Sequence, residues 1–147
     1  MDILDKINSD LVEAMKARDG VRTITLRGIK SAIKYREIEK GENIVEDDVI
    51  AVLSSMAKKH RDSIDQYGKA GRDDLVVNEK GELEIVLSYL PEQLDRAELE
   101  KLVDAVISEL GAEGPSGIGA VMKTIMPKVK GRADGKMVKE IVSSRLS

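Results

Sequence analysis

The stretch "DRAELEKLVDAVISELG", residues 95–111, has the clearest helical pattern in the chain. Asp95, followed three residues later by Glu98, matches a capping box, in which the two residues satisfy amides of the first helical turn. Gly111 comes after the last apolar residue and predicts a left-handed helix stop. The apolar residues recur every three or four positions and fall on one helix face: Leu99, Leu102, Val103, Val106, Ile107 and Leu110.

Similar spacing predicts three helices before this stretch, over residues 3–17, 21–40 and 45–71. Gly28, in the middle of the second, favours close packing of another helix there, since glycine in a helix interior costs up to ~1 kcal/mol relative to alanine. The expected buried side of that helix carries Ile24, Gly28, Ala32 and Tyr35, with Leu26, Ile29 and Ile33 widening the stripe.

Residues 72–90 allow two interpretations. "LVVNEKGELEIVL" (75–87) places two β-prone runs around a glycine-containing turn, as in a β-hairpin. However, Val76, Leu83, Leu87 and Leu90 keep the spacing of a helical stripe. The local pattern alone leaves both structures open.

After residue 111, we expect a helix from about residue 118, bent or ended by Pro127, and a last helix that begins after Asp134. Trp and Phe are absent from the 147 residues and only three tyrosines are present, which suits helices better than a β-sandwich. The expected fold is therefore all-α. We place an N-terminal domain of about four helices over residues 1–91 and a small three-helix domain over residues 95–147.

The sequence offers no convincing active site. His60 is the only histidine and lies at the edge of an apolar helix face, which favours a structural role over catalysis. Ser54 and Lys58 lie within one helical turn of each other, but a mid-helix serine has no free backbone amide for an oxyanion hole. The acidic triplet 46–48 falls at a helix start, where the helix dipole favours negative charge. We expect no catalytic residue, metal site or cofactor.

The chain has no cysteine, which excludes disulfides and thiolate metal sites. Its opening "MDILDKINSD" lacks the apolar segment of a signal peptide. No apolar run approaches the roughly 20 residues that cross a bilayer. We expect a soluble, cytoplasmic, monomeric protein without a membrane partner.

Positive charge gathers near the C-terminus of a chain whose net charge is −3. Residues 1–94 hold 15 basic and 19 acidic side chains, whereas residues 123–145 hold seven basic and two acidic ones. Glycines within this segment would let a ligand approach the backbone, and the start of the last helix would add free amides for an anion. A solvated basic face with helix-capping glycines is the alternative. The candidate nucleic-acid-binding residues are Lys123, Lys128, Lys130, Gly131, Arg132, Gly135, Lys136 and Lys139.

Several motifs resemble the GatB/YqeY-like family of small bacterial proteins. They are "LRGIKSAI" (26–33), "KKHRDSIDQYGKAGRDDL" (58–75), "YLPEQL" (89–94), "MPKVKGRADGKMV" (126–138) and the ending "SSRLS" (143–147). The resemblance covers essentially the whole chain. It implies an all-helical architecture and favours helix over hairpin for residues 72–90.

The C-terminal unit also resembles the tail domain of the B subunit of the tRNA-dependent amidotransferase. That resemblance implies binding of tRNA or another structured RNA, with the cations on phosphates and Asp134 capping the last helix. The family description of a carbon–nitrogen ligase with glutamine as amido-N-donor implies no activity that these residues could perform alone. The alternative function is a protein-interaction module that docks on amidotransferase or aminoacyl-tRNA synthetase components.

Overall fold

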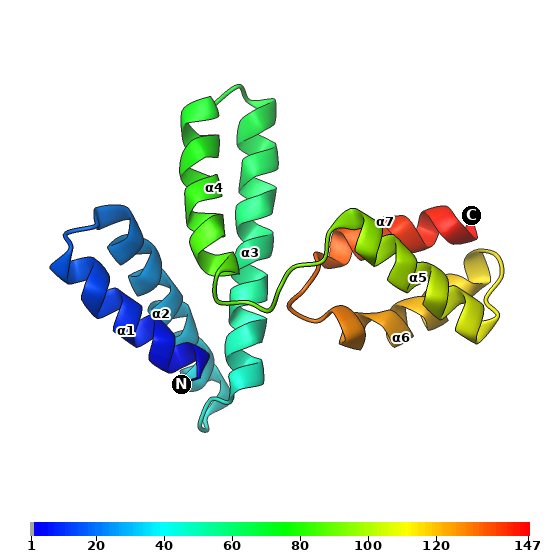
Figure 1. Ribbon diagram of the computed structural model, residues 1–147, viewed down its shortest axis with the longest axis horizontal. Helices are drawn as coiled ribbons and strands as arrows, with labels where there is room; N and C mark the ends of the chain where they lie inside the picture. Colours follow the sequence, from blue (N-terminus) through cyan, green and yellow to red (C-terminus); the bar gives the residue numbers. More distant parts are fainter. Residues whose placement is uncertain (1) are drawn as a thin grey trace. The chain divides into compact units, whose positions relative to one another are not determined.

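The computed structural model describes residues 2–147, and every regular element among them is helical (Figure 1). A 3-10 turn, η1 (Pro115–Gly117), precedes α6. The α-helices are α1 (Ile3–Lys16), α2 (Gly20–Lys40), α3 (Glu46–Lys69), α4 (Asp73–Leu87), α5 (Arg96–Leu110), α6 (Ile118–Val129) and α7 (Gly135–Leu146). The all-α prediction is confirmed.

The chain divides into two compact units, one that ends at Pro91 and one over Glu92–Ser147. Each unit has its own aliphatic core, the first built from α1–α4 and the second from α5–α7. In the first unit, α3 and α4 lie side by side along most of the length of α4 (Figure 1). That each unit folds alone, as separate domains would, stays a prediction.

The buried face of α2 is only part of the predicted one: Leu26, Ile29 and Ile33 are buried as predicted. Leu26 and Ile29 are fully buried, but Ile24 and Tyr35 are 68% and 71% exposed. An added Cβ at Gly28 would meet no atom within 4 Å, so no helix packs closely there. The prediction failed because α2 is apolar on two faces, and spacing does not say which face meets the core.

Helix α4 runs without a break from Asp73 to Leu87, through Gly81. The hairpin interpretation is therefore wrong for this segment. Local β propensity is overridden because α4 packs against α3 and buries Val86 in the first core.

The start of α3 gives the acidic triplet a structural role. Asp48 accepts hydrogen bonds from the Val45 amide (3.0 Å) and from Lys40 Nζ (2.6 Å), and it also pairs with Arg36 at 3.8 Å. The hydrogen bond from Lys40 holds the pKa of Asp48 below its ordinary value. Asp48 thus ties the end of α2 to the start of α3.

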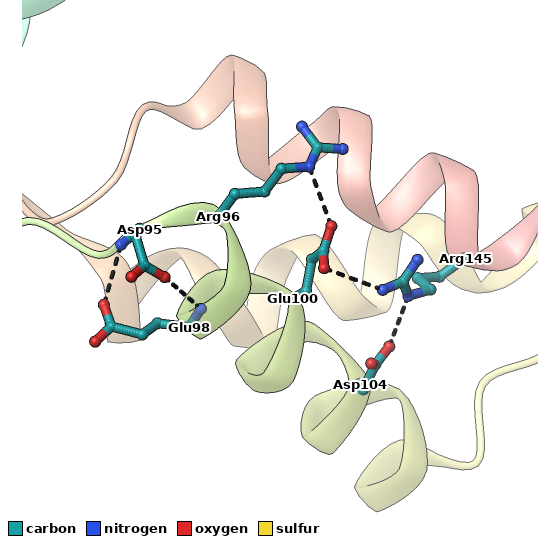
Figure 2. Close-up of polar contacts among 6 residues, drawn as sticks. All are labelled: Asp95, Arg96, Glu98, Glu100, Asp104 and Arg145. Carbon is teal, nitrogen blue, oxygen red and sulfur yellow. Dashed lines mark hydrogen bonds and ion pairs between the residues drawn. The ribbon is translucent and has the colours of Figure 1, made fainter.

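The second unit begins as predicted. Asp95 and Glu98 each accept a hydrogen bond from the other's amide, at 2.8 and 3.0 Å (Figure 2), and Gly111 ends α5 with φ +61°. Pro127 does not end α6, which continues to Val129. The proline lies in the last turn, where its missing amide removes only one hydrogen bond, to the carbonyl of residue 123.

Tyr89 connects both ends of the first unit. Its ring is 5% exposed, and its hydroxyl donates to Asp10 Oδ2 over 2.6 Å. Burial, together with the Asp10 carboxylate, raises the pKa of the Tyr89 phenol. Asp10 also pairs with Arg22 at 3.6 Å, so the three side chains join α1, α2 and the residues after α4.

We predict that Tyr89→Phe lowers the free energy of unfolding by about 1–2 kcal/mol, because the variant cannot form the buried hydrogen bond to a carboxylate while the ring stays. Urea unfolding followed by circular dichroism measures this. Tyr35→Phe is the matched control and should change the value by less than about 0.5 kcal/mol, since its ring is exposed. Equal effects of the two substitutions would contradict the role of Tyr89.

Candidate nucleic-acid interface

The predicted binding residues surround the connection between α6 and α7. This connection lies at one end of the second unit, where α6 ends and α7 begins (Figure 1). Lys128 is in the last turn of α6, Lys130 follows that helix, and Lys136 is the second residue of α7. All three lysines are exposed.

Buried neighbours on the same helices turn the lysines outward. On α6, Val121, Ile125 and Val129 form one fully buried face of the second core. Lys123 and Lys128 lie off that face and are exposed. The apolar stripe therefore fixes which side of the unit carries positive charge.

The α6–α7 loop is held by the segment just before α5. The Leu94 amide donates to the Arg132 carbonyl (2.8 Å), and Gln93 Nε2 donates to the Gly131 carbonyl (2.6 Å). Arg132 Nε in turn donates to the Glu92 carbonyl over 3.2 Å. Arg132 therefore helps to fix the loop.

The start of α7 is already capped. Asp134 Oδ1 accepts a hydrogen bond from the Lys136 amide at 3.2 Å, as the sequence predicts for Asp134. The expectation of free amides at this helix start is wrong for Lys136, because the Asp134 carboxylate occupies its amide. An anion here would rely on the lysine side chains.

The two glycines of the segment differ in their geometry. Gly131 has φ +73°, which a residue with a side chain rarely adopts. Gly135 has an ordinary helical backbone, and a Cβ there would only touch Met126 Cε at 3.6 Å. The shape of the loop therefore depends on Gly131 and not on Gly135.

Not every cation of the segment is free. Arg145 Nε donates to Asp104 Oδ1 (2.9 Å) and its guanidinium lies 3.7 Å from Glu100, so it joins α7 to α5 (Figure 2). Lys128 Nζ is 3.8 Å from a Glu109 oxygen, a weak pair between exposed side chains. Among the described residues, no ion pair involves the other lysines of the segment: Lys123, Lys130, Lys136 and Lys139.

The structure brings some predicted residues together and leaves others apart. Lys130 and Lys136 flank the same short loop, and Lys139 follows Lys136 by about one turn of α7. Lys123 precedes Lys128 by about 7.5 Å along α6 and points from a different side of the helix. The compact part of the site is therefore the loop and the start of α7, with Lys123 and Lys139 at its edges.

A second exposed surface lies on α2 of the first unit. Four large apolar side chains on one face of this helix are between 63% and 71% exposed: Val21, Ile24, Tyr35 and Ile38. We call these four residues the α2 stripe. Exposed basic residues run beside it (Arg27, Lys30 and Lys34), and on its other side α2 and α3 form a groove of about 440 Å³.

Comparison with known proteins gives the family of the chain. The model of the family described as "Yqey-like protein" matches residues 4–146. The chain belongs to the YqeY-like family. This confirms the resemblance drawn from the sequence motifs, over almost the entire chain.

Curated relatives of this YqeY-like chain are identical to it at about a third of the aligned positions. "Altered inheritance of mitochondria protein 41, mitochondrial" of Lachancea thermotolerans is 34% identical over 79% of the chain and 64% of the relative. The protein of the same name from Saccharomyces cerevisiae is 33% identical over 71% of the chain and 60% of the relative. The protein of this name from Kluyveromyces lactis is 32% identical over 79% of the chain and 64% of the relative.

The chain spans less than two thirds of the length of these relatives. Their names place those yeast proteins in mitochondria, whereas the sequence motifs alone had indicated a bacterial family. Among the described residues, no helix is both long and apolar enough to span a membrane.

Two features of the surfaces described above were not predicted from the sequence. Ile24 and Tyr35 of the α2 stripe were assigned to the core, because α2 is apolar on two faces and spacing does not say which face is buried. The pairing of Arg145 with α5 was also missed, because the partners lie 41 and 45 positions earlier in the chain.

We predict that Gly131→Ala lowers the free energy of unfolding by roughly 1–2 kcal/mol, because alanine is strained at positive φ. Gly135→Ala should change it by less than about 0.5 kcal/mol, since its backbone is helical and its surroundings accept a Cβ. Thermal and urea unfolding of the two variants measure the difference. Equal destabilisation would show that the loop does not need a left-handed residue at position 131.

Proposed function

We propose that the second unit binds structured RNA, and tRNA in particular, through contacts between lysines and phosphates. The observation that carries the proposal is the set of unpaired, exposed lysines around the loop and the start of α7. Basic side chains that have no carboxylate partner can exchange their counterions for phosphates, which is the main source of sequence-independent affinity.

The charge distribution supports an oriented approach of the RNA. Residues 95–122 hold two basic and six acidic side chains, so most of α5 and its following loop repel a polyanion. The basic segment attracts it. A polyanion is therefore steered to the end of the unit that carries the α6–α7 loop.

The second unit has little means to read bases. The three tyrosines of the chain are all in the first unit, at positions 35, 67 and 89. Without aromatic rings for stacking, recognition would depend on the shape and charge of the RNA backbone. A folded RNA such as tRNA fits this mode better than an unstructured single strand.

The resemblance of this unit to the amidotransferase B-subunit tail favours tRNA over other folded RNAs. Amide transfer itself has no support in the described residues, and we propose binding without catalysis. The compartment also stays a prediction: the sequence favours the cytoplasm, and the names of the yeast relatives favour mitochondria.

We predict that the triple variant Lys130→Gln, Lys136→Gln and Lys139→Gln weakens tRNA binding at least tenfold near 0.1 M salt. The slope of log affinity against log salt should fall in magnitude by roughly 2 to 3, because each phosphate that a lysine neutralises adds about 0.7–0.9 to that slope. Fluorescence anisotropy with labelled tRNA over a salt series measures both quantities.

The control for this experiment carries Gln at Lys16, Lys58 and Lys80, exposed residues of the first unit. Its net charge changes by the same amount, and it should bind like the unchanged protein. Equal weakening in both variants would show that net charge, and not the position of the lysines, determines the affinity. If the protein does not bind tRNA at low salt, the proposed function is wrong.

The α2 stripe favours a second function, docking of a protein partner. Its occupant would be an amphipathic helix with an acidic flank, because the stripe is bordered by Arg27, Lys30 and Lys34. A second copy of α2 fits less well, because the basic residues beside the stripe of one copy would repel those of the other copy. Amidotransferase or aminoacyl-tRNA synthetase components are the proposed carriers of such a helix.

For this second function, we expect an amidotransferase or synthetase component to bind the protein in the presence of RNase. The double variant Ile24→Glu and Tyr35→Glu should weaken that binding at least tenfold, through both reduced apolar burial and repulsion. Val77→Glu is the control, because Val77 is 68% exposed on α4, away from the stripe. Biolayer interferometry with purified components measures the affinities; failure to bind, or equal effects of the substitutions, would contradict docking on α2.

A further inference from the structure

A histidine and two glutamates meet between α3 and α4. His60 Nδ1 on α3 lies 2.6 Å from Glu79 Oε2 and 3.7 Å from Glu82 Oε2, both on α4. One ligand atom from each of the three side chains falls within 4.8 Å of the others. Their side chains are 16%, 21% and 34% exposed, so the cluster is half-buried.

The helix pair explains why these side chains converge. Glu79 and Glu82 are three residues apart on α4 and therefore share one face of it. That face meets α3, which runs beside α4 (Figure 1). The sequence predicts no metal site, because His60 precedes the glutamates by about 20 positions and residue spacing does not show that α3 pairs with α4.

The charges of the cluster do not balance. Among the described residues, the ion pairs of Glu79 and Glu82 involve only His60, and no Lys or Arg lies within 4.0 Å of either carboxylate. A protonated imidazole would still leave one negative charge in excess. Half-buried carboxylates with such an excess favour a cation of higher charge.

We propose that His60, Glu79 and Glu82 bind a divalent transition-metal ion, and Zn²⁺ in particular. Zinc bonds of about 2.0–2.1 Å place neighbouring tetrahedral ligands roughly 3.3 Å apart. The 2.6 Å contact has to open and the 3.7 Å contact has to close, each by less than about 1 Å, which side-chain rotation can supply. Three protein ligands leave a fourth position for water.

The ligand set selects among metals. Imidazole nitrogen with two carboxylates suits zinc and similar transition metals. Calcium prefers six to eight oxygen ligands, and magnesium prefers an octahedral oxygen shell, so one nitrogen and two carboxylates hold either poorly. Zinc would bridge α3 and α4 and stabilise the folded first unit by binding it selectively.

The test uses the full-length protein after treatment with EDTA, titrated with ZnCl₂ by isothermal calorimetry. We expect one saturable site, with affinity reduced at least tenfold in His60→Gln, Glu79→Gln and Glu82→Gln. Glu84→Gln is the matched control, because Glu84 is exposed on the same helix and outside the cluster. MgCl₂ should give no comparable binding.

A second measurement uses the single histidine of the chain. Zinc should shift the Nδ1 resonance of His60 in a two-dimensional ¹H–¹⁵N spectrum of the imidazole, and the unchanged far-UV spectrum of each variant should show that it folds. No saturable zinc site in the unchanged protein would overturn the proposal. Equal affinity in Glu79→Gln and Glu84→Gln, or a His60 signal that zinc leaves in place, would overturn it as well.

Discussion

Both units of this protein are held together by the burial of aliphatic side chains between helices. Without Trp or Phe, each core is filled mainly by Leu, Ile, Val and Ala from several helices that must meet on their apolar faces. The same packing decides where the charges go. Because Val121, Ile125 and Val129 face the second core, the lysines of α6 are turned toward solvent.

Hydrogen bonds along the chain then convert an exposed basic segment into a defined surface. Residues 92–94 hold the loop between α6 and α7 at the Gly131 and Arg132 carbonyls. Asp134 fixes the first turn of α7. The lysines beside this loop are thus attached to a backbone of fixed shape, which would lower the entropic cost of the proposed contacts with phosphates. Arg132 and Arg145 serve the fold, and the exposed lysines are available to a ligand.

The sequence predicts the helices well and their faces less well. Asp95, Glu98 and Gly111 carry local hydrogen-bonding and backbone signals, so the limits of α5 follow from them directly. The buried face of α2 cannot be predicted in this way, because that helix is apolar on two sides. Its packing against neighbouring helices determines that Leu26, Ile29 and Ile33 are buried. The meeting of His60 with Glu79 and Glu82 depends on the pairing of α3 with α4, which residue patterns near 72–90 leave open. For the candidate RNA surface, the basic residues can be identified from the sequence. The structure is needed to show which of them form ion pairs with carboxylates.

An NMR titration of the ¹⁵N-labelled protein with unlabelled tRNA at low salt would show where RNA binds. We expect amide shifts to concentrate in residues 128–139, with the strongest changes next to Lys130 and Lys136, and added salt to reverse them. Shifts confined to the first unit, or spread evenly over both units, would contradict an RNA surface built from the α6–α7 loop.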